Sequence, residues 1–221
     1  MNSKIIKYII IILLLPVVPL KATAQTGIYY STNGQLSSSL INQLYQDHRG
    51  FIWISTEFGL NKFDGTHFTH YKHIDNDSTS LINNHVRGVF EDSYRNLWIR
   101  CLGGLMLYHP ETDDFELIKI EGKEGRHVTN IMELHNGEVW GITTGDTIFR
   151  INLTQKVIEP IDEINRKLRL KSFSSIYEDT RRNLWFISET QGLLCFNPKS
   201  EEIQHFKYPD IPDNNISAIK E

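Results

Sequence analysis

Residues 46–65 read QDHRGFIWISTEFGLNKFDG, and this stretch decides the fold because spaced copies of it recur along the chain. Its fixed points are Asp47, which stands six residues before Trp53, and Gly59-Leu60, which begins six residues after that tryptophan. Self-similarity with a period of roughly 20–50 residues is the signature of repeat architectures. The fold therefore follows from how these positions recur over the 221 residues.

Four tryptophans set the period of the repeat, with successive separations of 45, 42 and 45 residues. The repeated signature consists of Asp47, Trp53 and Gly59, then Asp92, Trp98 and Gly104, then Trp140, and finally Asp179, Trp185 and Gly192. The third copy has Leu134 in place of the aspartate and Thr147 in place of the glycine. It is therefore the degenerate copy.

Each copy is rich in β-branched and aromatic residues between turn-forming residues, a pattern that predicts short strands and not helices. In the first copy, the predicted strands cover residues 40–46, 51–56, 59–63 and 68–72. The carboxylate of Asp47 is expected to accept amide hydrogen bonds across the turn after the first strand. Four strands in each copy are expected for a propeller blade. The predicted fold class is thus all-β, a β-propeller with four-stranded antiparallel blades.

The repeat predicts how the chain is divided. We expect a lead-in at 25–37, four blades at 38–84, 85–126, 127–171 and 172–213, and the first strand of a fifth blade at 214–221. Because the sequence stops in that strand, we expect a truncated product with an incomplete ring. Propellers protect their sheet edges by radial closure. We therefore expect this fragment to aggregate readily when it is expressed alone.

The first 24 residues belong to a different physical class. Lys4 and Lys7 precede an apolar run at 8–20, and Ala22-Thr23-Ala24 has the small-x-small pattern of a signal-peptidase site. The apolar run has 13 residues, fewer than the roughly 20 that span a bilayer. We therefore expect a signal peptide helix at 1–24, cleavage between Ala24 and Gln25, and export of the remainder to the periplasm.

The motif QDxxGxIWI at 46–54, followed by GLNxFDG at 59–65, resembles the two-component regulator propeller repeat. The run at 73–86 resembles the link between two such blades, and the resemblance covers residues 38–221. In that family the repeats form the extracytoplasmic N-terminal sensor part of hybrid two-component system histidine kinases, which detect breakdown products of polysaccharides. Arg100-Cys101 is a departure, since the family usually has Gly-Thr there.

This resemblance implies a periplasmic ligand-sensing propeller segment of a two-component receptor, with an oligosaccharide ligand and a homodimer in the full-length receptor. Kinase and phosphorelay activity would belong to domains absent from this chain, and anchoring in the inner membrane would come through a region beyond its C-terminus. We therefore expect no enzyme activity, cofactor or metal in this segment. The alternative is a stand-alone exported propeller that serves as a scaffold, or as a carbohydrate-binding or carbohydrate-active protein.

Composition and motifs argue against other functions. The 23 Lys and Arg and the 27 Asp and Glu are interspersed, so we expect no nucleic acid partner. The string of His67, His70 and His73 suggests a metal site, but a spacing of three on a strand places neighbours on opposite faces. Asp-box sialidases have Asp-x-Gly-x-x-Trp, which this repeat does not match. A glycoside hydrolase hypothesis would require two opposed carboxylates, and the acidic residues around the loops are Glu57, Glu111, Asp113 and Glu189.

Two cysteines and two aromatic residues complete the candidates. Cys101 and Cys195 stand at different repeat positions in non-adjacent copies, so we expect two buried free thiols and no disulfide. Ligand sites of repeat folds are usually built from loops at one end. Phe58 and Tyr94 are the loop aromatics that could stack on a sugar face, although Tyr94 could equally pack within its own turn.

Overall fold

The computed structural model describes residues 29–120, 127–145, 147–169, 173–188, 192–211 and 216. The chain divides into two compact units, Met1–Tyr30 and Ser31–Glu221, and the described strands belong to the second. The expected signal peptide with its cleavage point lies outside the described residues, as does nearly all of 214–221. Within the described ranges, no helix is both long and apolar enough to cross a membrane.

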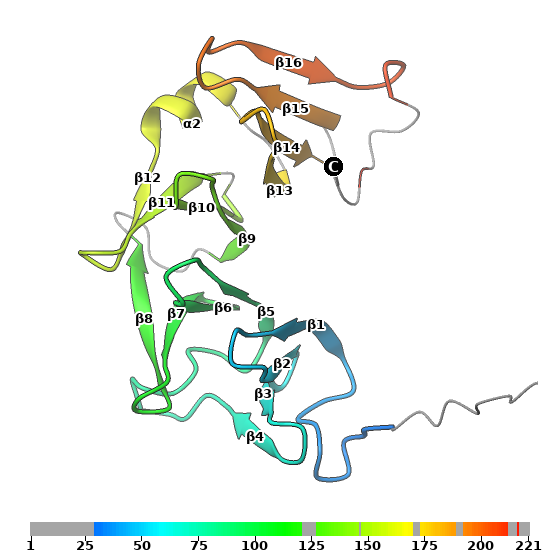
Figure 1. Ribbon diagram of the computed structural model, residues 1–221, viewed down its shortest axis with the longest axis vertical. Coiled ribbons are helices and arrows are strands. Elements are labelled where there is room, and N and C mark those ends of the chain that lie inside the picture. The colour runs from blue at the N-terminus through cyan, green and yellow to red at the C-terminus, as the bar shows by residue number, and fades with distance from the viewer. Residues whose placement is uncertain are drawn as a thin grey trace, which may run out of the picture. The chain divides into compact units, whose positions relative to one another are not determined.

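Four antiparallel four-stranded units, which we call blades 1 to 4, follow one another along the chain (Figure 1). Blade 1 consists of β1 (Ile41–Gln46), β2 (Ile52–Thr56), β3 (Gly59–Phe63) and β4 (Phe68–Tyr71). Blade 2 consists of β5 (Val86–Glu91), β6 (Leu97–Cys101), β7 (Gly104–His109) and β8 (Asp114–Ile120). Blade 3 consists of β9 (Val128–Glu133), β10 (Val139–Thr143), β11 (Ile148–Asn152) and β12 (Val157–Pro160). Blade 4 consists of β13 (Phe173–Glu178), β14 (Leu184–Ser188), β15 (Gly192–Phe196) and β16 (Ile203–Phe206).

Strands pair with their chain neighbours within each blade, which confirms the predicted all-β class with four-stranded antiparallel blades. The four strands predicted for the first copy agree with β1 to β4 to within one residue at each end. This agreement follows from turn chemistry, because glycine in the left-handed region closes the turns. Gly50 has a φ of 89° between β1 and β2, and Gly65 has a φ of 101° between β3 and β4.

Two features depart from a simple series of blades. The outer strands β8 and β12 pair in parallel, with Val157 opposite Lys119, so blades 2 and 3 share one eight-stranded sheet. Blade 3 is also followed by a short helix, α2 (Asp162–Leu168), where the sequence pattern predicted strands and turns only. Ile161, Ile164 and Leu168 of this segment pack on the apolar cluster between blades 3 and 4. Their i, i+3, i+7 spacing explains the helix.

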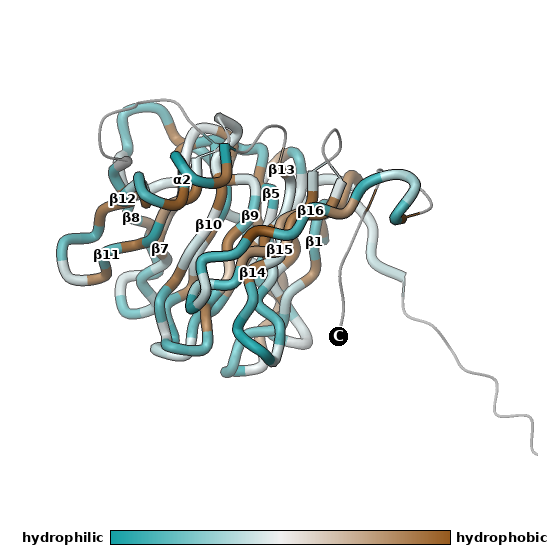
Figure 2. Tube along the Cα trace, turned by 90° about the horizontal axis from the view of Figure 1, so that it is seen from above, coloured by the Kyte–Doolittle hydropathy of each residue, from teal (hydrophilic) through white to brown (hydrophobic). Residues whose placement is uncertain are grey.

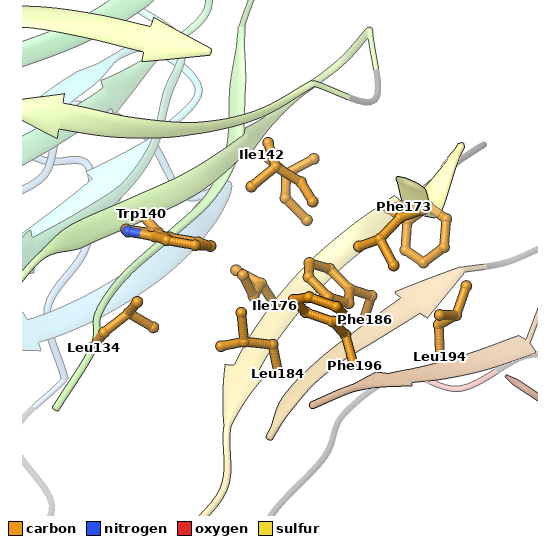
Figure 3. Packing of buried hydrophobic residues seen from close by; sticks show 11 residues of the cluster. Leu134, Trp140, Ile142, Phe173, Ile176, Leu184, Phe186, Leu194 and Phe196 are labelled. Carbon is orange, nitrogen blue, oxygen red and sulfur yellow. The ribbon is translucent and has the colours of Figure 1, made fainter. Parts of the chain in front are cut away.

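Apolar side chains form clusters between successive blades. Many of the connecting turns are hydrophilic, as the colouring of the chain trace shows (Figure 2). Each blade has a tryptophan face, which carries the repeat tryptophan, and a leading face, which carries the aliphatic residue nine positions earlier. The leading-face aliphatics are Leu44, Val89, Ile131 and Ile176. The tryptophan face of one blade packs on the leading face of the next, as Trp140 and Ile176 show (Figure 3). Burial between blades is therefore the main stabilising interaction of the fold.

Candidate functional site

The repeat aspartate and tryptophan are joined by a hydrogen bond. In blade 1 the indole Nε1–H of Trp53 donates to Asp47 Oδ2 over 2.9 Å, while the backbone N–H groups of Arg49 and Phe51 donate to Asp47 Oδ1 at 3.0 Å each. The equivalent indole bonds in blades 2 and 4 are Trp98 to Asp92 at 2.9 Å and Trp185 to Asp179 at 2.8 Å. A single carboxylate thus accepts hydrogen bonds both from the backbone of the turn and from the buried indole N–H.

Blade 3 satisfies its indole differently. Leu134 occupies the aspartate position, and the Nε1–H of Trp140 donates instead to Glu138 Oε2 over 3.1 Å. Glu138 stands two residues before the tryptophan, where blades 2 and 4 have Asn96 and Asn183. Unlike Asp92, which is buried, Glu138 is exposed. The degenerate copy therefore keeps the carboxylate–indole bond but brings its carboxylate to the surface.

The signature glycines begin the third strand of their blades. A Cβ on Gly59, whose φ is 136°, would lie 2.8 Å from the backbone oxygen of Tyr71. A Cβ on Gly104 would lie 2.7 Å from Leu117 Cδ1, and Gly192 has a φ of 77°. These positions serve backbone geometry and close packing. Together with the tryptophans and aspartates, they support the blades and do not line a common site.

A second repeated contact ties each blade to the next, and we call it the inter-blade latch. The residue after the turn aspartate position donates its backbone N–H to a glutamate at the end of the next blade's first strand. The pairs are His48 with Glu91 Oε2 at 2.9 Å, Ser93 with Glu133 Oε2 at 2.7 Å, and His135 with Glu178 Oε2 at 2.6 Å. Blade 1 has Gln46 at the glutamate position, and its amide donates to Gly50 in its own turn.

The loop acid Asp113 belongs to a network between blades 1 and 2. Its Oδ1 accepts from Lys62 Nζ at 2.9 Å and from Tyr71 at 2.6 Å, and it also accepts from the hydroxyl of Tyr108. Burial lowers the pKa of Lys62, but its bonds to Tyr108 and Asp113 raise that pKa above the usual value overall. Burial and the bond to Asp113 raise the pKa of Tyr71. Asp113 therefore ties blades together.

A depression of about 540 Å³ lies on the tryptophan face of blade 4. Trp185, Asn183, Cys195 and Gln204 are among its lining residues. Burial opposes ionisation of Asp179 beside it, but hydrogen bonds from Trp185 and Asn183 lower the pKa of that carboxyl below its usual value. In blades 1 to 3 the following blade covers this same face. The depression therefore occupies the position on blade 4 where, in blades 1 to 3, the next blade packs.

Another depression, of about 320 Å³, lies between the first turn of blade 2 and blade 3. Tyr94 forms one wall, is 65% exposed, and places its hydroxyl 3.3 Å from the position of a Cβ on Gly137. The remaining wall is largely polar and includes Asn136, Glu138, Arg150, Asn152 and Glu159. We call this the Tyr94 depression.

The polar groups of the Tyr94 depression are suited to hydrogen bonding. Glu159 accepts from Asn152 Nδ2 at 2.8 Å and from Arg150 Nε at 3.1 Å, and these two bonds lower the pKa of Glu159. An ionised acceptor of this kind does not serve as a proton donor at neutral pH. An exposed aromatic ring beside amides and carboxylates matches the apolar face and the hydroxyl groups of a sugar. The depression is therefore our candidate ligand site.

The other candidates from the sequence are dispersed. Phe58 is 57% exposed in the turn between β2 and β3. His70 Nε2 donates to the backbone oxygen of Gln35 at 3.2 Å, and His73 Nδ1 donates to that of Leu81 at 2.7 Å, so the histidines have separate partners. In the described part of the chain, no group of three or more potential ligand residues is placed to hold a metal.

The remaining candidates add no cluster. Cys101 and Cys195 are free and buried. Of the loop acids, Glu111 is exposed, Glu57 is partly exposed, and Glu189 lies outside the described residues. Sequence reasoning missed Glu138 and the wall of the Tyr94 depression. Glu138 could have been found as the carboxylate that stands near the third tryptophan where the aspartate is missing.

Comparison with known proteins gives the fold and the repeat a context. Residues 35–58 match the family model described as two component regulator propeller. Over 138 residues the chain is 30% identical to histidine kinase P4 of Formosa agariphila, an alignment that covers 59% of this chain and 10% of the kinase.

Solved structures with a similar fold include two extracellular domains from B. thetaiotaomicron. That of the hybrid two-component system BT3049 has a TM-score of 0.71 and 24% identity over 82% of this chain and 26% of its own. That of BT4673 has a TM-score of 0.64 and 20% identity over 79% of this chain and 25% of its own. Virginiamycin B lyase from Staphylococcus aureus has a TM-score of 0.56 and 19% identity over 82% of this chain and 59% of its own.

These comparisons confirm the resemblance that the repeat residues indicated, and the structural likenesses show the fold. The chain spans about a tenth of the length of the kinase and about a quarter of the two extracellular domains.

Proposed function

We propose, on the premise that the chain carries the two-component regulator propeller repeat, that it is a periplasmic ligand-sensing segment of a two-component receptor and that it senses a polysaccharide-derived ligand. The observation that carries the proposal is the repeat itself: four successive blades, with the family model matching residues 35–58, which include the first two strands of blade 1. The likeness to extracellular domains supports a location outside the cytoplasm.

The Tyr94 depression is the surface that suits such a ligand best. Its exposed ring offers stacking area, and Glu138, Asn152 and Glu159 offer acceptors and donors for sugar hydroxyls. The depression lies between two blades, so a bound oligosaccharide would contact both sides of an inter-blade junction. Ligand binding would thereby favour one packing of the blades, which is how a sensor converts occupancy into a structural change.

The receptor context supplies the remaining parts of the proposal. Homodimerisation, attachment to the inner membrane and phosphotransfer would belong to the full-length receptor, through regions beyond this chain. The segment itself would bind ligand and transmit a change in packing.

The test is a binding screen of the full chain against oligosaccharides prepared from neutral and acidic polysaccharides, measured by isothermal titration calorimetry. We expect one class to bind, and Tyr94→Ala to weaken that binding about tenfold, because stacking on one ring contributes about 1–1.5 kcal/mol. Phe58→Ala is the matched control, an equally exposed loop aromatic in another turn, and should leave affinity unchanged. Equal losses in both variants would remove the Tyr94 depression from the proposal.

A second experiment addresses the receptor function. Autophosphorylation of the full-length receptor in membranes should respond to the oligosaccharide that binds the chain. If no oligosaccharide binds and none changes phosphorylation, the sensing proposal is wrong.

A further inference from the structure

Two arginines in blade 2 stand at positions where the other blades have uncharged residues. Arg87 lies eleven residues before Trp98, and Arg100 lies two residues after it. The residues equivalent to Arg87 are Asn42, Thr129 and Ser174, and those equivalent to Arg100 are Ser55, Ile142 and Ile187. The arginine pair is therefore a departure of one blade from the repeat and not a requirement of the fold.

The two arginines lie on adjacent strands of blade 2, Arg87 on β5 and Arg100 on β6. The register of β5 against β6 shifts between Val86 and Gly88, so Arg87 stands at a bulge. Arg100 on β6 lies directly opposite Gly88. The equivalent strand pairs of blades 1 and 4 have the same shift, between Ile41 and Gln43 and between Phe173 and Ser175, so the bulge belongs to the repeat and the arginine on it is what differs in blade 2.

The absence of a side chain at Gly88 makes room for the guanidinium of Arg100. A Cβ on Gly88 would lie 2.4 Å from Arg100 Nη2 and 2.0 Å from Gln43 Oε1. Gln43, on blade 1, accepts the backbone N–H of Val89 over 2.8 Å, and Arg100 Nη1 donates to the backbone oxygen of Thr129 on blade 3. The guanidinium of Arg100 therefore lies where three blades meet.

The charges of this pair are not compensated. The Nε atoms of both Arg87 and Arg100 are buried and have no hydrogen-bond partner. Among the ion pairs of the described residues, none includes either arginine. Burial, together with the nearby charge of Arg87, lowers the pKa of Arg100. Two like charges with unmet buried donors are costly unless an anion joins them.

We propose that Arg87 and Arg100 form a binding site for an oxyanion of the carboxylate or sulfate class. The N–H groups of a guanidinium match the paired oxygens of such groups, and both side chains are partly exposed, so a solute can reach them. The bound anion would offset the positive charges of the two guanidinium groups and would accept hydrogen bonds from their two Nε–H groups. This site lies on residues different from the Tyr94 depression and does not rest on the proposed sensing function.

The test compares thermal unfolding of the full chain in sodium sulfate, sodium acetate and sodium chloride at equal ionic strength. We expect sulfate or acetate at low millimolar concentration to raise the unfolding midpoint by about 3 °C over chloride. Arg87→Gln should abolish this rise, since it removes one of the two cations without removing any described hydrogen bond. Arg166→Gln, at an exposed arginine of α2 whose Nε donates to the backbone oxygen of Asp162, is the matched control and should keep the full rise.

Direct binding separates the site from a general salt effect. Titration with sodium sulfate, followed by NMR of the arginine Nε–Hε signals, should shift the two signals that disappear in Arg87→Gln and Arg100→Gln, with binding weakened at least about tenfold in Arg87→Gln. Replacing sulfate by glucuronate, with glucose as the neutral counterpart, tells whether a sugar carboxylate is accepted. An equal rise in midpoint in all variants, with no selective shift of these signals, would overturn the proposal.

Discussion

The indole N–H of the repeat tryptophan is the group that every blade must satisfy. Three blades use an aspartate six residues earlier, and blade 3 uses Glu138. A buried donor that loses its acceptor costs about 1–3 kcal/mol, so the acceptor matters more than its position in the sequence. The two solutions differ in burial, since Asp92 is buried and Glu138 is exposed.

We therefore expect Asp92→Ala to lower the free energy of unfolding by about 2–3 kcal/mol, because it leaves the indole N–H of Trp98 and the backbone N–H groups of the turn without an acceptor. Glu138→Ala should cost about 1 kcal/mol or less, since water can reach its exposed position. Urea unfolding followed by tryptophan fluorescence measures both. Equal costs would show that the two carboxylates are energetically equivalent.

The decrease in the free energy of unfolding at acidic pH should depend on Asp113. Burial raises the pKa of Asp113, but the hydrogen bonds from Tyr108, Tyr71 and Lys62 outweigh burial and lower the pKa below its usual value. A carboxyl with a lowered folded-state pKa stabilises the protein above its unfolded pKa and loses that contribution as pH falls through the folded value. In Asp113→Asn, stability should thus be reduced at pH 7 and should decline less steeply below pH 4. Glu111, an exposed acid in the same loop, supplies the control variant Glu111→Gln.

At the scale of elements, the inter-blade latch joins the end of one first strand to the turn of the preceding blade. Glu91 accepts from the backbone N–H of His48 and also contacts its ring, and its side chain is nearly buried. Gln46 is the equivalent residue of blade 1 and bonds to its own turn over 3.3 Å.

Glu91→Ala should lower the free energy of unfolding by about 1–2 kcal/mol, and Glu91→Gln by less, because the amide oxygen can still accept from His48. Gln46→Ala should change it by no more than about 0.5 kcal/mol. Chemical denaturation of the three variants is the measurement. A loss in Gln46→Ala as large as in Glu91→Ala would refute a role for the latch.

The strands of the first copy were predictable because turn residues and β-branched runs alternate clearly around Trp53. The helix α2 was not, although Ile161, Ile164 and Leu168 have helical spacing, since a seven-residue element between strands gives too short a pattern to outweigh the repeat. The pairing of β8 with β12 also escaped prediction, because contacts between non-consecutive strands depend on how the blades pack.

The same reason limits what sequence could say of the candidate sites. Tyr94 stood out as a loop aromatic, but its neighbours Glu138 and Glu159 come from another blade, and their convergence is a property of packing. Arg100 stood out as a departure from the family pattern. Its proximity to Gln43 across Gly88 required the structure.

At the scale of the whole molecule, burial between blades decides stability. Val89 on the leading face of blade 2 is 2% exposed, whereas the equivalent Leu44 of blade 1 is 63% exposed. The same residue class at the same repeat position therefore has opposite environments within one chain.

Val89→Lys should lower the free energy of unfolding by about 3 kcal/mol or more, because it buries a charge without a partner. Leu44→Lys should change it by no more than about 0.5 kcal/mol and should improve solubility, since it removes exposed apolar surface. Thermal unfolding and light scattering measure the two effects. A large loss of stability in Leu44→Lys would mean that this face is covered in solution.

The different acceptor in blade 3 bears on how such blades are recognised in sequences. Because the indole of Trp140 donates to Glu138, the position six residues earlier does not need an acceptor and can hold Leu134. A motif search that demands aspartate six residues before tryptophan overlooks a copy of this kind. A search that accepts a carboxylate either six or two residues before the tryptophan would also detect blades that lack the aspartate but keep the carboxylate–indole hydrogen bond.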